Sequence, residues 1–283
     1  MGLTKILLYT GIFIAGFVII SLWNFYSVIR PPKIDIPLTP TDFGLTIEEV
    51  TITTADKLTL SAWLIENPQT RKKKRAVMIL HGYPADKRDM LSFAGRLHDD
   101  FTLLLLDMRY FGESDGVYTT LGIKERYDIS EAINFLESRG YEEVGILGFS
   151  LGGAVGLLSA SEDTRIKAVA SYASFADLPT LGVDVYSRLF ILKKPMTELM
   201  LLWSRLFFNE SAREISPLNA VKTLSIPVLI IHPKQDEQIP FSHALLLKDA
   251  LTQNKNAQFL FPDGLHGDIP EDIYTQLKTF FAQ

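Results

Sequence analysis

The chain has 283 residues, of which 47% are hydrophobic and 22% are charged, and its formal net charge is −5. This charged fraction is close to that of ordinary folded proteins and excludes a disordered chain. The net negative charge gives no indication of a nucleic-acid-binding protein. The chain contains no cysteine, which excludes disulfides, a cysteine nucleophile and thiolate metal ligands. Without the N-terminal segment roughly 240 residues remain, enough for one large domain with a buried core.

The N-terminal segment is a predicted transmembrane helix. Residues 6–29 carry no charge, and a helix of that length measures about 36 Å, enough to cross a hydrocarbon core of about 30 Å with some tilt. Trp23 and Tyr26 lie near its end, where aromatic rings favour the membrane interface. Pro31 and Pro32 then end the helix, because proline has no N–H and disfavours helical backbone in the residue before it.

Two alternatives to an uncleaved membrane anchor are a cleaved signal peptide and a buried core helix. The apolar stretch is long for a signal peptide, and no A-x-A-like cleavage site follows it. A core helix would be shorter or amphipathic. The sequence therefore predicts a single-pass membrane protein. Lys5 before the span and Arg30 and Lys33 after it weakly favour a cytoplasmic domain, whereas the short N-terminus suits export of the domain, so both orientations stay open.

The segment 30–45 is rich in proline and threonine and is a predicted linker, and residues 46–283 form the predicted folded domain. Short apolar runs in this domain predict strands that are buried on both faces of a sheet. Helical periodicity between the runs indicates a mostly parallel sheet with helices on both faces. The predicted strands are 50–54, 58–65, 76–80, 101–106, 144–147, 166–171, 228–231 and 258–261, and the most regular predicted helices are 125–138, 241–251 and 273–281.

Two segments depart from this alternation. Residues 175–216 are too long for an ordinary connection between strands and are rich in Leu, Phe, Met and Trp. They predict two or three helices that cover the sheet as a lid. Residues 71–75 form a basic run, which favours a solvated loop over a patch for lipid headgroups or nucleic acid.

The sequence Gly148-Phe149-Ser150-Leu151-Gly152 is a G-x-S-x-G motif between a predicted strand and a run of small residues that begins a helix. This context matters because a nucleophilic serine must lie on a tight turn from strand to helix, with its hydroxyl projecting from the sheet. Glycines permit the close backbone approach that such a turn requires. Ser150 is therefore the predicted nucleophile, against the alternative of an ordinary Gly/Ser turn.

A serine hydroxyl needs a base, and the base needs an orienting carboxylate. His266 follows the last predicted strand and precedes the last helix, at the edge of the sheet where catalytic loops gather. Asp236 follows the strand before it, which gives the chain order Ser, Asp, His. Glu237 is the nearest competing acid, and His81 is expected to be structural.

The oxyanion of an acyl-transfer reaction needs two N–H donors. Leu151, directly after the predicted nucleophile, supplies one. The loop His81-Gly82-Tyr83-Pro84 after the third predicted strand supplies the other, and Tyr83 is the predicted donor because Pro84 has no N–H.

These motifs, together with the turn from Asp107 to Ser114, resemble the α/β-hydrolase superfamily from about residue 48 to residue 281. The resemblance is to membrane-anchored Bem46-like and ABHD-type lipid hydrolases and to serine aminopeptidase-like hydrolases. In the turn, Tyr110 stands where the pattern D-x-R-G-x-G-x-S has glycine. The resemblance implies the α/β-hydrolase fold, with an eight-stranded, mostly parallel sheet, a helical lid and a Ser150-Asp236-His266 triad.

The predicted activity is hydrolysis of carboxylic esters, including lipid or acyl esters or thioesters, through an acyl-enzyme and without a metal or organic cofactor. The apolar lid beside a predicted membrane helix favours an acyl-chain substrate. One alternative is an amidase or aminopeptidase for small peptides, in which Glu198 or Asp184 binds an ammonium group. The other is a scaffold without catalytic activity. The sequence predicts neither the acyl-chain length nor the oligomeric state.

Overall fold

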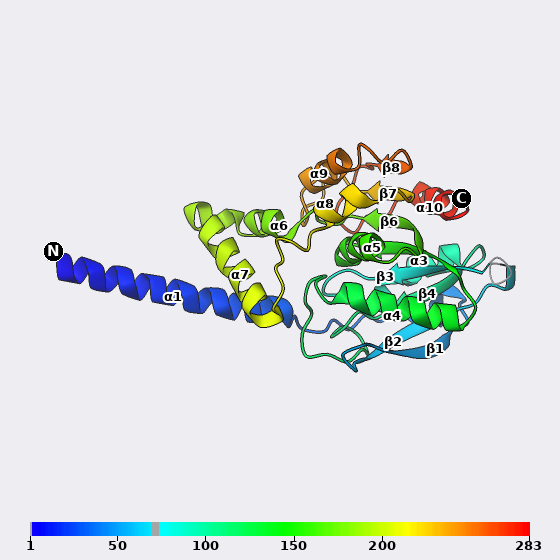
Figure 1. The fold of residues 1–283 in the computed structure, drawn as a ribbon, viewed down its shortest axis with the longest axis horizontal. Helices are drawn as coiled ribbons and strands as arrows, with labels where there is room; N and C mark the ends of the chain where they lie inside the picture. The colour runs from blue at the N-terminus through cyan, green and yellow to red at the C-terminus, as the bar shows by residue number, and fades with distance from the viewer. Residues whose placement is uncertain (1, 70–73) are drawn as a thin grey trace.

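The computed structural model describes residues 2–69 and 74–283. Its centre is an eight-stranded sheet with the strand order β1-β2-β4-β3-β5-β6-β7-β8 (Figure 1). Strand β2 pairs antiparallel with β1 and with β4, and all other neighbours are parallel. The predicted mostly parallel, eight-stranded sheet is therefore confirmed. Residues 71–73 of the basic run lie outside the described residues.

The strands lie where the apolar runs predict them. Alternate residues of β3 contact different cores: Ala76, Met78 and Leu80 belong to one apolar cluster, and Val77 and Ile79 belong to the other. A strand buried on both faces needs apolar side chains at consecutive positions, which is why these runs do not alternate with polar residues. The strands are β1 Glu48–Thr53, β2 Thr59–Ile65, β3 Arg75–Leu80, β4 Thr102–Leu106, β5 Glu143–Phe149, β6 Ile166–Tyr172, β7 Val228–Ile231 and β8 Ala257–Leu260.

Helices cover both faces of the sheet (Figure 1). One cluster contains apolar residues of α4 (Glu125–Ser138), α5 (Leu151–Glu162) and α9 (Ser242–Ala250). The cluster on the other face contains residues of α3 (Leu91–Leu97) and α10 (Glu271–Phe281). The two clusters are the two halves of one core, separated by the sheet.

Two segments, the lid and helix α1, extend the fold beyond these layers. The lid between β6 and β7 contains α6 (Leu178–Val185), the 3-10 helix η3 (Ser187–Leu192) and α7 (Lys193–Phe208), and α8 (Pro217–Ala220) follows it. Helix α1 (Leu3–Ile29) begins three residues before the predicted span and projects from the domain on the side of the lid (Figure 1). By length and composition the helix could cross a membrane, since an 18-residue window within it has a mean hydropathy of 2.3. The remaining short helices are η1 Pro40–Phe43, η2 Lys87–Met90 and η4 Val221–Thr223.

Tyr110, in the turn after β4, has a backbone conformation that glycine adopts at a lower energetic cost. Tyr110 has φ 76°, in the left-handed region that disfavours a side chain. Its hydroxyl donates a hydrogen bond to Pro31 O over 2.6 Å, and Lys33 lies over its ring at 5.6 Å. The Tyr110 side chain therefore holds Pro31 and Lys33 against the domain. Glycine at this position could not make these contacts.

Arg109 in the same turn forms a buried ion pair that holds helix α4 against the sheet. Its Nε and Nη2 donate to the two carboxylate oxygens of Asp128 over 2.7 and 2.5 Å, and its Nη1 donates to Asp56 over 3.0 Å. The side chains of Arg109 and Asp128 are only 6% and 1% exposed. A carboxylate with so little access to water depends on its guanidinium partner.

Replacement of Arg109 by alanine is therefore expected to lower the free energy of unfolding by about 3–5 kcal/mol, because Asp128 loses its only buried cation partner among the described residues. Denaturation of the detergent-solubilised chain would measure the change. Arg139→Ala, which breaks a solvent-exposed pair with Glu48, is the control and should give a far smaller loss. Equal losses in the two variants would contradict the proposed role of the buried pair.

Candidate active site

Ser150 lies on a sharp turn between β5 and α5. Its backbone has φ 52° and ψ −114°, a strained conformation for a residue with a side chain. The turn is fixed on both sides, because Ser150 N–H donates to Tyr172 O over 2.7 Å and Ser150 O accepts from Gly153 and Ala154. The strain therefore persists at the residue that the sequence predicts as nucleophile.

Two glycines make this turn possible. A Cβ on Gly148 would lie 2.2 Å from Gly152 O, and a Cβ on Gly152 would lie 2.4 Å from Leu80 O. Both distances are far below van der Waals contact with rigid backbone, so any side chain would push α5 away from the sheet. The two glycines of the motif thus serve close packing of the turn.

The structure brings His266 and Asp236 together from two different loops. His266 follows β8 and Asp236 follows β7, and the His266 Nδ1–H donates to Asp236 Oδ2 over 2.7 Å. Both residues are buried. The other ring nitrogen, Nε2, is then the atom that can accept a proton, as a general base must.

Asp236 is held as an ionised, oriented carboxylate. Burial alone would raise its pKa, but hydrogen bonds from His232 and His266 and from the N–H of Ile239 outweigh burial and hold the pKa of Asp236 well below its usual range. Oδ1 accepts from the N–H groups of Gln238 and Ile239 over 2.9 and 2.8 Å. The carboxylate therefore has little freedom to rotate away from the His266 ring.

His232 is a neighbour of this carboxylate that the sequence analysis did not find. Its Nε2 lies 2.9 Å from Ile239 O and 3.3 Å from Asp236 Oδ2. A carbonyl can only accept, so Nε2 carries the proton and points it at both oxygens. The only signal in the sequence is a histidine that ends a strand four residues before the aspartate.

The competing carboxylates have other partners. Glu237 accepts from the backbone N–H of His266 over 3.0 Å and so contacts the loop rather than the imidazole. Asp263 pairs with Lys234 at the surface. Asp268 accepts from Leu265 N–H within the histidine loop.

Phe149 links the histidine to the serine turn. Its ring centroid lies 5.1 Å from that of the His266 imidazole, and Phe149 directly precedes Ser150 in the chain. The imidazole is therefore on the same edge of the sheet as the serine turn, at the carboxyl ends of the parallel strands.

The predicted oxyanion donors also lie at this edge. Leu151 is the first residue of α5, so its N–H has no partner within the helix. Tyr83 lines the same pocket as Ser150, and a Cβ on Gly82 would lie only 3.2 Å from Ser150 Cβ. The loop that carries Tyr83 therefore packs directly against the serine.

His81 supports this loop from behind. Its Nδ1–H donates to Gly82 O over 2.8 Å, and its Nε2 accepts from Met108 N–H over 3.1 Å. The ring is fully buried, and burial lowers the pKa of His81. The imidazole is thus neutral and fixed by the backbone, as expected for a structural histidine.

An apolar pocket of about 380 Å³ opens at Ser150. Its walls come from the loop that carries Tyr83, the lid helices and, unexpectedly, helix α1. None of the described residues that line it carries a charge. They are Phe25, Val28, Tyr83, Thr120, Leu121, Ser150, Leu151, Phe175, Leu178, Leu181, Gly182, Val185, Tyr186, Thr197, Met200, Leu201, Ser204, Phe208, Ala212, Gln238 and Ile239.

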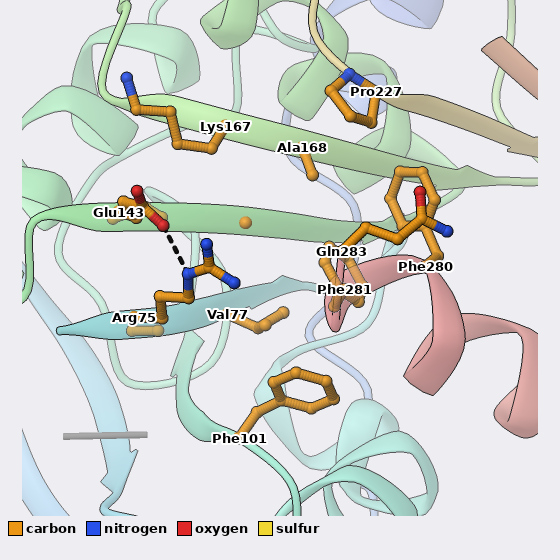
Figure 2. A pocket seen from close by; sticks show the side chains of 13 residues that line it. Arg75, Val77, Phe101, Glu143, Lys167, Ala168, Pro227, Phe280, Phe281 and Gln283 are labelled. Atoms are coloured by element: carbon orange, nitrogen blue, oxygen red, sulfur yellow. Dashed lines mark hydrogen bonds and ion pairs between the residues drawn. The ribbon is translucent and has the colours of Figure 1, made fainter. Parts of the chain in front are cut away.

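A second cavity, of about 180 Å³, lies at the amino ends of the parallel strands, opposite the ends near Ser150. Figure 2 shows Arg75 and Glu143, which are the first residues of β3 and β5, beside Phe281 of α10. A Cβ on Gly145 would lie 2.8 Å from the Phe281 ring, so the missing side chain makes room for that ring. Ser150 follows the last residue of β5, and this cavity is therefore remote from the serine.

The model of the α/β hydrolase fold family matches residues 75–198. The protein bem46 of Schizosaccharomyces pombe is 24% identical over 260 residues, which cover 87% of this chain and 80% of that protein.

The fold is also found in solved structures of other proteins. A Pyrococcus furiosus esterase has a TM-score of 0.73 at 22% identity and covers 90% of this chain and 97% of its own. A Pyrococcus horikoshii acylaminoacyl peptidase has a TM-score of 0.64 at 20% identity and covers 84% of this chain and 41% of its own. The family match, the bem46 relative and the shared fold show that the chain has the α/β-hydrolase fold and resembles the Bem46-like hydrolases.

Proposed function

We propose that the chain is a membrane-anchored serine hydrolase that cleaves carboxylic esters with Ser150, His266 and Asp236 as its triad. The fold and its esterase and peptidase neighbours support hydrolase activity in general. The fold alone does not choose the substrate, since it carries many reactions. The choice of an ester depends on the chemistry of the pocket at Ser150.

In the proposed first step, Ser150 Oγ attacks the ester carbonyl carbon while its proton moves to His266 Nε2. Asp236 keeps the proton on His266 Nδ1 and stabilises the imidazolium that forms. The carbonyl oxygen becomes an oxyanion, which the N–H groups of Leu151 and Tyr83 stabilise. The imidazolium then returns its proton to the leaving alkoxide, which departs as an alcohol and leaves the acyl group on Ser150.

Water completes the cycle. His266 Nε2 takes a proton from a water molecule, whose oxygen attacks the acyl carbon and forms a second oxyanion. Collapse of this intermediate breaks the bond to Ser150 Oγ, which regains a proton from the imidazolium. A carboxylic acid is released, and the side chains return to their starting protonation states.

The uncharged, apolar pocket is the observation that carries the choice of an acyl ester. An aminopeptidase needs an anion for the substrate ammonium, and the two acidic lid residues considered for that task have other partners. Asp184 lies 3.2 Å from Nε2 of the buried His243, and Glu198 pairs with Arg213. A neutral acyl chain fits the pocket without leaving a buried charge unpaired.

The contacts of helix α1 support an anchor that stays attached. Phe25 and Ile29 are buried in a cluster with Leu201 and Phe208 of the lid helix α7. Cleavage of the segment after translocation would expose this cluster to water. An uncleaved helix instead keeps the cluster closed and holds the domain at the membrane surface.

A matched substrate panel tests the proposal. An ester, a thioester and an aminoacyl amide are compared on the purified full-length chain in detergent, and a fluorophosphonate is used to label its serine. We expect ester turnover, slower or absent amide turnover, and loss of activity in proportion to labelling of Ser150. Faster amide turnover would favour the peptidase alternative, and a folded chain without label or turnover would favour the scaffold.

A further inference from the structure

Helix α1 has two parts with different surroundings. Residues 3–20 include no buried residue, whereas Ser21, Phe25 and Ile29 are buried against the rest of the chain. At 1.5 Å per residue the exposed part extends about 27 Å, close to the roughly 30 Å of a hydrocarbon core. The exposed part is thus nearly sufficient to cross a membrane, and the remainder, Ser21–Ile29, is called the docked segment below.

Hydrogen bonds tie the docked segment to the oxyanion loop and to the lid. The hydroxyl of Tyr83 donates to Val28 O over 3.0 Å. The indole Nε1–H of Trp203 in α7 donates to Ser21 Oγ over 2.9 Å. These partners belong to two different parts of the candidate site, so the position of the docked segment is fixed relative to both.

Two side chains of the docked segment line the pocket that contains Ser150. Phe25 and Val28 face the cavity together with residues of α6 and α7. The Phe25 ring also packs on Phe207 and Phe208, with centroids 5.3 and 5.8 Å apart. A water molecule takes about 30 Å³ in the liquid, so the cavity of about 380 Å³ has room for about a dozen groups the size of a methylene.

The end of the lid between α6 and α7 lies on the side from which α1 leaves the domain (Figure 1), and it carries exposed apolar side chains, called the tip below. Phe190 and Ile191 are 81% and 88% exposed, and Val185 is 59% exposed. Exposed Arg188 and Lys194 flank the tip. Apolar side chains beside basic ones are typical of segments that enter the membrane interface and attract anionic headgroups.

We infer that the docked segment is a wall of the substrate pocket, and that the substrate is a membrane lipid ester whose acyl chain passes from the bilayer into this pocket. The inference rests on the proposed ester hydrolysis at Ser150 and specifies its substrate class. The acyl chain lies against Phe25 and Val28 while its carbonyl is at Ser150. The anchor therefore does more than tether the domain, because it also limits the length of chain that the pocket accepts.

Full-length variants in phosphatidylcholine vesicles test this with a series of monoacylglycerols from butyryl to palmitoyl. Phe25→Trp should lower kcat/KM for the dodecanoyl ester at least tenfold, because each buried methylene is worth about fourfold. The butyryl ester, whose chain is eight carbons shorter, should change less than about threefold. Phe25→Ala should shift the preference in the opposite direction, toward longer chains.

Phe13→Trp is the matched control, because Phe13 is 58% exposed on the same helix and does not line the pocket. It should keep the wild-type chain-length profile. Wild-type profiles in both Phe25 variants would overturn the inference, while turnover and labelling of Ser150 would leave the proposed ester hydrolysis intact. Absence of turnover of every ester by the wild type would instead overturn the proposed function itself.

A second arm tests the source of the chain. Long-chain ester dissolved in the vesicles that carry the protein should be hydrolysed faster than the same amount supplied in protein-free vesicles. Equal initial rates would show that the pocket takes free ester from water, and would overturn delivery from the bilayer.

Discussion

Replacement of Ser150 by alanine is expected to lower kcat for an ester about 10⁶-fold, to near the rate that the remaining groups of the site provide. The variant retains the pocket and the oxyanion donors but has no oxygen to form an acyl-enzyme. Initial rates with the best ester of the series, measured on folded protein, would give the ratio. The free energy of unfolding should change little, because alanine keeps the Cβ of the turn.

The control for Ser150→Ala is Ser159→Ala in the same helix, α5. Ser159 is buried, and its hydroxyl has no hydrogen-bond partner among the residues that the structure describes, so its loss should leave turnover unchanged. Residual turnover within about tenfold of wild type in the Ser150 variant would remove this serine as the nucleophile.

Asp236→Asn is expected to lower kcat about 10⁴-fold. An amide cannot replace a carboxylate that accepts from the Nδ1–H of His266 and from the N–H groups of Gln238 and Ile239. The amide would favour the imidazole tautomer with the proton on Nε2, which cannot accept the serine proton. Steady-state kinetics together with circular dichroism would separate this loss from misfolding.

The neighbouring acid gives the control for Asp236→Asn. Glu237→Gln keeps an oxygen that can accept the backbone N–H of His266 and should retain activity within a few-fold. If the loss were larger in the Glu237 variant than in the Asp236 variant, Glu237 would be the orienting acid and the proposed triad would be wrong.

The strands were the most predictable part of the fold. The runs 76–80 and 144–147 are apolar at nearly every position because parallel strands are covered on both faces, and this pattern survives without tertiary information. Helix α4 has the predicted bounds, 125–138, because its apolar residues repeat at helical spacing. The bounds of helix α3 were not predicted, because seven residues, Leu91–Leu97, are too few to establish a helical period.

The residues of the candidate site follow from the sequence where the proposed chemistry restricts the residue type, and they do not where packing decides which side chains come together. A serine turn, a histidine after the last strand and an acid between them have a fixed order in the chain, which led to Ser150, Asp236 and His266. His232 Nε2 lies 3.3 Å from Asp236 Oδ2 because the loop between the two residues folds back on itself. The sequence pattern does not predict that conformation. The place of Phe25 in the pocket depends on the angle at which α1 meets α7, and an apolar helix does not encode that angle in its composition.

The way in which α1 joins the domain has a practical consequence for preparing shortened forms of the protein. A chain that starts after Pro31 would leave the indole of Trp203 and the hydroxyl of Tyr83 without the acceptors that Ser21 and Val28 supply. It would also bare the apolar surface of α7 that Phe25 covers, which favours aggregation. A start just before Ser21 would retain both acceptors and omit most of the exposed apolar helix, and is therefore the better boundary for crystallisation.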